Sequence, residues 1–165
     1  MSLANECYGQ QYHVDVGIRC QKTIGLYFEN GIASQWSLDQ LANQRLYLGL
    51  GFVSSRLGSA LGTNAIKQDN YQIWLAYYFR KDKKLRSFAS LNSGYFIANY
   101  EEEIFDVLDN SSMLLSGSSG VEYTLPLKLK LNAAIGYNLI SGNGEEGPGT
   151  LYPLFAQFTV YYPLR

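Results

Sequence analysis

The sequence predicts an all-β fold: a closed, antiparallel, up-and-down β-barrel of about eight strands that is transmembrane. Residues 127–140, LKLKLNAAIGYNLI, alternate between apolar and polar or small side chains, and successive side chains of a strand point to opposite faces. This segment exceeds the ~5–6 residues of an ordinary strand and reaches the ~9–11 residues that cross a bilayer. The same alternation recurs along the chain, and longer and shorter connections alternate between the segments.

The composition fits one domain of this kind. The 165 residues include 14 Tyr, 8 Phe and 16 Gly, and charged residues make up 16%, against roughly 25% in an average soluble domain. The net charge of −1 gives no general attraction to nucleic acid. The mean hydropathy of −0.13 is compatible with a barrel, because lipid-facing and interior residues alternate and average out. Residues 1–10 are interpreted as a leader or tag with an N-terminal segment, and 11–165 as a single barrel domain.

The first four predicted strands are residues 12–21, 24–33, 45–54 and 71–79. Each has large apolar side chains at alternate positions, and most positions between them hold small or polar residues. The apolar faces consist of Val14, Val16, Ile18 and Cys20; Ile24, Leu26, Phe28 and Ile32; Leu46, Leu48, Leu50 and Phe52; and Tyr71, Ile73, Leu75, Tyr77 and Phe79.

The last four predicted strands are residues 87–100, 112–125, 127–140 and 152–162. Residues 87–100 are the least regular, because Phe88 and Phe96 fall outside the alternation. The final strand alternates up to Tyr162. The apolar faces of the last three consist of Met113, Leu115, Val121, Tyr123 and Leu125; Leu127, Leu129, Leu131, Ala133, Ile135, Tyr137 and Leu139; and Tyr152, Leu154, Ala156, Phe158, Val160 and Tyr162.

The connections alternate in length. Longer ones, at residues 56–70, 101–110 and 141–150, follow the third, fifth and seventh strands, whereas those after the fourth and sixth are short. The connection at residues 34–44 is longer than this pattern requires. Membrane barrels have short turns at one end and longer loops at the other. The lengths therefore predict that the longer loops share one end of the barrel.

The second face of the strands predicts the barrel interior. It is rich in Gly and Ala, which suits a narrow lumen where small side chains lie beside large ones. Charged residues on this face are expected to form a polar network in the lumen, with Lys128 and Lys130 paired to carboxylates such as Glu122. Solvated surface charges are the alternative interpretation. The expected network consists of Asp15, Arg19, Glu29, Glu122, Lys128 and Lys130.

The long alternating strands, the aromatic residues at their ends and the alternating last strand resemble the small eight-stranded outer-membrane barrels of Gram-negative bacteria. The resemblance implies an outer-membrane location, contact with membrane lipid or detergent, and lipopolysaccharide or a surface protein as a partner. One feature departs from it. Such barrels commonly end on an aromatic residue, whereas this chain ends Tyr162-Pro163-Leu164-Arg165.

Catalytic residues are not expected. The one histidine, His13, shares a face with Asp15 but has no nucleophile beside it, so a hydrogen-bonding role at the rim is favoured over general-base work. The acidic runs Glu101-Glu102-Glu103 and Glu145-Glu146 lack calcium-loop spacing. They are expected to be solvated residues of external loops.

No cofactor or metal site is expected. Cys7 and Cys20 are interpreted as isolated thiols, although an oxidising envelope permits a bridge between them. The sequence therefore favours a non-enzymatic outer-membrane barrel of structural or surface-interaction role, acting through its external loops. A soluble or periplasmic, lipocalin-like barrel for an apolar ligand is the first alternative, and a lipid-modifying enzyme is the second.

Overall fold

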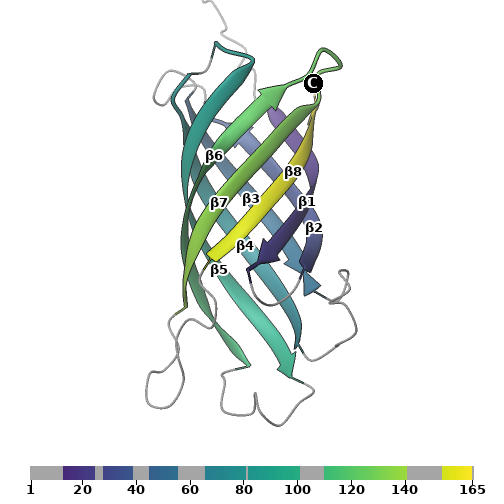
Figure 1. The fold of residues 1–165 in the computed structure, drawn as a ribbon, viewed down its shortest axis with the longest axis vertical. Coiled ribbons are helices and arrows are strands. Elements are labelled where there is room, and N and C mark those ends of the chain that lie inside the picture. Colours follow the sequence, from purple (N-terminus) through teal and green to yellow (C-terminus); the bar gives the residue numbers. More distant parts are fainter. Residues whose placement is uncertain are drawn as a thin grey trace, which may run out of the picture.

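The computed structural model describes residues 13–24, 28–38, 45–55, 66–80, 82–100, 110–140 and 154–164. These residues form a closed, up-and-down, antiparallel barrel, in which every strand pairs with its sequence neighbours and β8 pairs with β1 (Figure 1). The barrel predicted from the alternation is confirmed. No helix within the described segments is long and apolar enough to cross a membrane. The strands are β1 (Val14–Thr23), β2 (Phe28–Ser37), β3 (Leu46–Ser54), β4 (Ile66–Tyr78), β5 (Leu85–Tyr100), β6 (Ser111–Thr124), β7 (Lys130–Ile140) and β8 (Leu154–Leu164).

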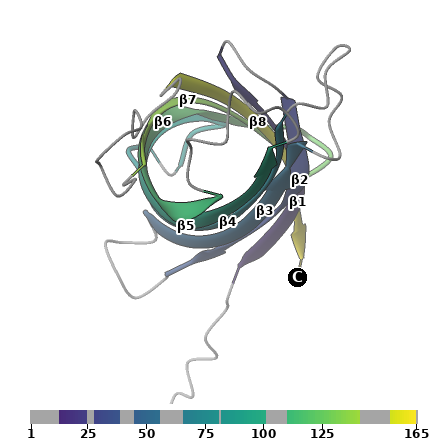
Figure 2. The same ribbon diagram turned by 90° about the horizontal axis from the view of Figure 1, so that it is seen from below.

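The strands are staggered by ten residues around the barrel. A row of paired residues that starts at Phe28 on β2 returns to β2 at Leu38, whose N–H donates to the carbonyl of Leu46. A stagger of this kind tilts the strands by roughly 35–45° to the axis, and the tilt is visible in Figure 1. Viewed along its axis, the sheet forms a ring (Figure 2). Eight strands leave an interior about wide enough for side chains. Between Phe28 and Leu38, the row of register partners passes through one residue on each of the other strands: Lys22, Ala156, Ile135, Ser119, Ala89, Tyr77 and Leu46.

Three strands differ clearly from their predicted bounds. Strand β2 lies four residues further along than expected, because the polar residues Gln35 and Ser37 are buried in the interior and continue the strand. Strand β4 starts at Ile66 rather than at 71, and its first residues pair with β5 although they lack the apolar alternation. Strand β7 starts at Lys130 rather than at 127. For β2 and β4, polar residues near a strand end gave the segment the composition of a connection. For β7, the alternation of Leu127, Lys128 and Leu129 gave a turn the pattern of a strand.

The apolar face points outward and the polar face points inward. Ile18, Ile32 and Ile135 are each at least 65% exposed, while Asp15, Glu122 and Thr159 on the opposite face are fully buried. A soluble barrel that holds an apolar ligand requires the reverse arrangement. The lipocalin-like alternative therefore does not fit the structure.

Outward-facing aromatic residues form two bands, which we call the terminus-side belt and the loop-side belt. Aromatic girdles of this kind mark the two membrane interfaces of a barrel. Phe28 and Trp36, eight residues apart on β2, span roughly 26 Å along the strand and about 20 Å along a strongly tilted barrel axis. This height is close to the roughly 25 Å apolar band of membrane barrels. The terminus-side belt contains Trp36, Tyr77, Phe79, Tyr123 and Tyr162, and the loop-side belt contains Phe28, Phe52, Tyr71, Tyr95 and Tyr137.

Arginine placed on the outer wall tests this orientation. Ile18 lies in the middle of β1, facing lipid, and Ile24 lies just beyond the loop-side end of the same strand. We expect Ile18→Arg to lower the free energy of unfolding in lipid vesicles by ~2–4 kcal/mol, and Ile24→Arg by at most about 1 kcal/mol, since the penalty depends on depth. Urea titration of both variants measures the difference. Equal losses at the two positions would contradict the membrane orientation.

Candidate functional site in the barrel interior

A buried ion pair joins β5 and β6 near the end of the barrel that carries the chain termini. Arg86 and Glu122 are register partners on these strands, and both side chains point inward. The guanidinium donates to Glu122 Oε1 from Nη2 at 2.6 Å and from Nε at 2.8 Å. The Tyr78 hydroxyl donates to the second carboxylate oxygen at 2.8 Å, and the Tyr78 ring lies 4.0 Å from the Arg86 guanidinium carbon. Glu122 thus has both oxygens satisfied although it is fully buried.

A second ion pair crosses the interior from β7 to β1. Lys130 Nζ lies 2.8 Å from Asp15 Oδ1 and 2.6 Å from Oδ2, although β8 lies between the two strands. Gln35 donates from Nε2 to Asp15 Oδ2 at 3.0 Å. Its other amide atom, Oε1, lies 3.5 Å from the hydroxyl of Tyr78. The two ion pairs therefore belong to one connected network.

Arg19 occupies the middle of the lumen and has no carboxylate partner among the described residues. Its guanidinium lies 4.1 Å from the centre of the Trp74 ring, a cation–π contact. Each nitrogen also donates a hydrogen bond. The acceptors are Thr159 Oγ1 at 3.3 Å, Gln72 Oε1 at 3.0 Å and the Tyr161 hydroxyl at 3.3 Å.

Trp74 is accommodated in the lumen because β3 carries glycine opposite it. Trp74 and Gly49 are register partners, and a Cβ atom at Gly49 or Gly51 would collide with the indole ring. The Gly-rich face seen in the sequence therefore has a specific use here. It makes room for the aromatic ring that holds Arg19.

Glu29 lies toward the opposite end, and its hydrogen-bond partners among the described residues are neutral amides. Gln21 Nε2 donates to Glu29 Oε2 at 2.9 Å, and Asn70 Nδ2 donates to Oε1. The carboxylate is 1% exposed, and within the described part of the chain no cation forms an ion pair with it. Nearby, the buried Oε1 atom of Gln21 has no hydrogen-bond partner in the described part of the chain.

These side chains fill the lumen at the level of Arg19. The void between Arg19, Trp74, Tyr161 and their neighbours has a volume of about 10 Å³, which is space for about one water molecule. Groups of three or more His, Cys, Asp or Glu side chains suited to a metal ion do not occur in the described segments. At this level the described residues thus form a packed polar core.

Comparison with solved structures shows which known barrels share this architecture. The N-terminal β-barrel domain of Pseudomonas aeruginosa OprF superposes with a TM-score of 0.66, at 11% sequence identity, over 92% of this chain and 97% of that one. Neisserial surface protein A gives a TM-score of 0.55 at 13% identity, over 91% and 92% of the two chains. The outer-membrane enzyme PagL gives 0.53 at 13% identity, over 92% and 99%.

This is the fold of the small eight-stranded outer-membrane barrels. The resemblance noted in the sequence is confirmed at the level of architecture. No protein-family model matches the sequence, and no curated protein matches it significantly. The identities of 11–13% mean that the likeness concerns the fold alone.

Five of the six residues expected in the lumen of this outer-membrane-type barrel point into it. The expectation is wrong for Lys128, which is exposed in the turn between β6 and β7 and has a φ of 64°. The expected Lys130–Glu122 pair is also not formed. Lys130 pairs with Asp15, because the stagger brings these two residues to the same level, and Glu122 pairs with Arg86. The five are Asp15, Arg19, Glu29, Glu122 and Lys130.

Sequence reasoning missed the cationic partner of Glu122 and the role of the aromatic residues. Arg86 falls just outside the predicted strand at residues 87–100, yet it lies two positions before the inward-facing Phe88, so the period of two includes it. Trp74 and Tyr78 fall on the small-residue face of their strand. Large aromatic residues on that face were the available signal for cation contacts in the lumen.

The other predicted residues lie apart from this network. His13 is exposed at the terminus-side end, where its carbonyl accepts from Ser37 N at 3.0 Å. Cys20 is exposed on the outer wall of β1. The acidic loop residues and the first cysteine lie outside the described residues, and their expected roles remain predictions. They are Glu101, Glu102, Glu103, Glu145, Glu146 and Cys7.

Removing Lys130 tests the ion pair across β8. Lys130→Met leaves Asp15 buried without its cation, which typically costs ~3–5 kcal/mol. We expect a loss of this size in the free energy of unfolding, measured by urea titration in vesicles, and a partial recovery when Asp15→Asn is added. Lys128→Met, the same substitution in the exposed turn, should change stability by at most about 0.5 kcal/mol. Similar losses for the two lysines would contradict the assignment.

The two buried glutamates should respond differently to neutralisation. Glu122→Gln leaves Arg86 unpaired, with an expected loss of ~3–5 kcal/mol. Glu29→Gln leaves no cation unpaired, and its new amide group can donate to the free Oε1 of Gln21. We therefore expect a change within about 1 kcal/mol in either direction. A loss at Glu29 as large as that at Glu122 would show that a cation outside the described residues binds there.

Proposed function

We propose that the chain is a non-enzymatic barrel of the outer membrane, with a structural or surface-interaction role carried by its external loops. The observation that supports this proposal most directly is the packed lumen. Ion pairs and aromatic rings fill it, so it offers no space for a transported solute at the level of Arg19. An interior of this kind makes a rigid scaffold, and loops on rigid scaffolds are where binding residues concentrate.

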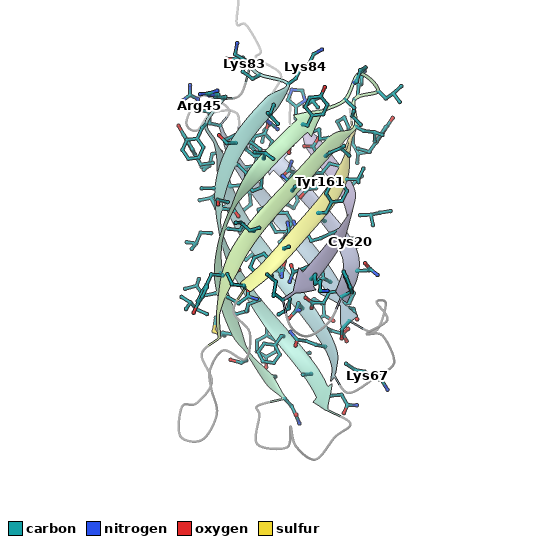
Figure 3. All side chains as sticks on the ribbon, viewed as in Figure 1. Cys20, Arg45, Lys67, Lys83, Lys84 and Tyr161 are labelled. Atoms are coloured by element: carbon teal, nitrogen blue, oxygen red, sulfur yellow. The ribbon has the colours of Figure 1, made fainter. Side chains whose placement is uncertain are left out.

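The strand directions support a common end for these loops. Strands β3, β5 and β7 all end away from the chain termini, so the connections that follow them leave the barrel on one side. Figure 3 places Arg45, Lys83 and Lys84 at one end of the barrel and Lys67 at the other. We propose lipopolysaccharide or a surface protein as the partner of the loop-side end. Surface location fits the likeness to a neisserial surface protein.

An enzymatic role is the alternative raised by the likeness to PagL, which is an outer-membrane enzyme. His13 is the residue such a role would use, because it is the one histidine of the chain and histidine is the side chain that most often serves as a general base. It lies at the terminus-side end, opposite the end where the longer connections leave the barrel. This position favours the non-enzymatic proposal.

Shortening the connection between β5 and β6 distinguishes the loop-mediated role from the enzymatic one. Replacing residues 101–109 with a two-residue Asn-Gly turn should leave the barrel folded, because the strands and the lumen network are unchanged. We expect the variant to keep its β-sheet circular dichroism and to lose binding to immobilised lipopolysaccharide or to intact cells.

Two controls accompany this variant. Replacing Asp82 and Lys83 in the turn at the opposite end should leave binding intact, and His13→Ala should change neither folding nor binding. Unchanged binding after the loop is shortened would contradict the role assigned to that loop. Hydrolysis or acyl transfer on lipid A that disappears with His13→Ala would replace the proposal with an enzymatic one.

A further inference from the structure

Two grooves of similar size lie on the outer wall of the described strands, at different levels of β1. The first, which we call the lysine groove, has a volume of about 590 Å³ and lies over β6, β7, β8 and the loop-side parts of β1 and β2. The second, the serine groove, has about 670 Å³ and lies over β8, β1, β2 and β3. Both volumes fall in the range of ligand sites. The two grooves therefore offer an internal comparison.

Small side chains form the floor of the lysine groove. Ala133 pairs with Phe158, and Ala156 pairs with Ile135, so each alanine lies beside a large residue across β7 and β8. Ile135 is 68% exposed and Phe158 45%, and these two side chains form ridges above the alanines. Cys20, labelled on β1 in Figure 3, lines the same groove. The lining is mostly apolar, as the binding of an acyl chain requires.

One end of the lysine groove carries a positive charge. Lys22 pairs with Phe28 of the loop-side belt on one side and with Ala156 of the groove floor on the other. Its Nζ lies 4.4 Å from the centre of the Phe28 ring, and Lys22 forms no ion pair with any residue that the structure describes. Between the two belts it is the only charged side chain facing lipid in the described strands. Lysine side chains at such a level direct the ammonium group to the lipid headgroups.

The serine groove lacks this feature. Its lining residues are apolar or small, with Ser34 at the floor between Ile18, Ile32 and Leu50, and none of them is charged. Lipid chains can cover both grooves without selectivity. Of these two grooves, the lysine groove alone combines an acyl-sized volume with a cation at the membrane interface. A basic group there favours an anionic headgroup.

We propose that the lysine groove binds one acyl lipid that has an anionic phosphate headgroup, from the leaflet on the loop side of the barrel. The phosphate group of the lipid lies at the Lys22 ammonium. One acyl chain runs from there over Ala156 and Ala133 toward the middle of the bilayer, between the ridges of Ile135 and Phe158. This binding is independent of the external loops.

Native mass spectrometry of the barrel in neutral detergent tests the proposal. Dioleoyl-phosphatidylglycerol and dioleoyl-phosphatidylcholine have the same chains and differ in charge. We expect one phosphatidylglycerol to bind more tightly than phosphatidylcholine. Lys22→Gln should weaken its binding roughly fivefold and leave phosphatidylcholine unchanged, whereas Lys22→Arg should retain the preference.

Two substitutions, each of which fills one groove with an aromatic ring, show which groove binds the lipid. Ala156→Phe occupies the floor of the lysine groove and should abolish the tight phosphatidylglycerol adduct. Ser34→Phe fills the serine groove in the same way and should leave that adduct intact, which also controls for an added aromatic ring on the outer wall. Both variants are compared only after their β-sheet circular dichroism matches that of the parent chain.

Several results would overturn the proposal. Equal affinity for the two lipids, or no effect of Lys22→Gln, would show that the ammonium does not select the headgroup. Loss of the adduct in Ser34→Phe but not in Ala156→Phe would move the site to the other groove. Displacement of the bound lipid by millimolar inorganic phosphate would show that the ion alone is recognised and that the groove does not hold an acyl chain.

Discussion

Closure of the barrel between β1 and β8 is the constraint on which the rest of the structure depends. In hydrocarbon no water is present to pair with backbone N–H and C=O groups, so a spanning sheet has to close on itself. The two terminal strands meet through ten register pairs, from Val14 with Leu164 to Thr23 with Phe155. Closure at eight strands and a stagger of ten residues sets a narrow lumen. It also assigns one face of every strand to lipid and the other to the interior.

The narrow lumen explains why glycine and large aromatic residues occur on the same face. An indole or phenol ring that points inward occupies space that would otherwise belong to side chains on the adjacent strands. Trp74 is accommodated by Gly49 and Gly51, and the Phe155 ring lies where a Cβ atom of Gly136 would be. The Trp74 ring in turn contacts the guanidinium of Arg19, as the inward-pointing Tyr78 ring contacts that of Arg86. Small residues on the interior face are therefore part of the charge network.

The alternation was sufficient to predict the architecture because its period of two is preserved wherever one face meets lipid. The prediction from the alternation failed where a strand continues beyond the part that faces lipid. Residues 66–70 form the start of β4 but extend beyond the loop-side belt, where neither face has to be apolar. The pairing of charges in the lumen was even harder to predict from the sequence than the strand bounds. Lys130 and Asp15 meet across an intervening strand, and only the stagger, which no single strand reveals, brings them to one level.

The two ends of the lumen differ in how charge is balanced. At the terminus-side end, both buried carboxylates have a cation. The remaining charges, Arg19 and Glu29, are diagonal neighbours, because Arg19 pairs in register with Gly31, two residues from Glu29. They do not pair with each other, since Trp74, Thr159, Gln72 and Tyr161 hold the guanidinium. The glycines on β3 that admit the Trp74 ring therefore also determine that, among the described residues, Glu29 is held by amides and not by Arg19.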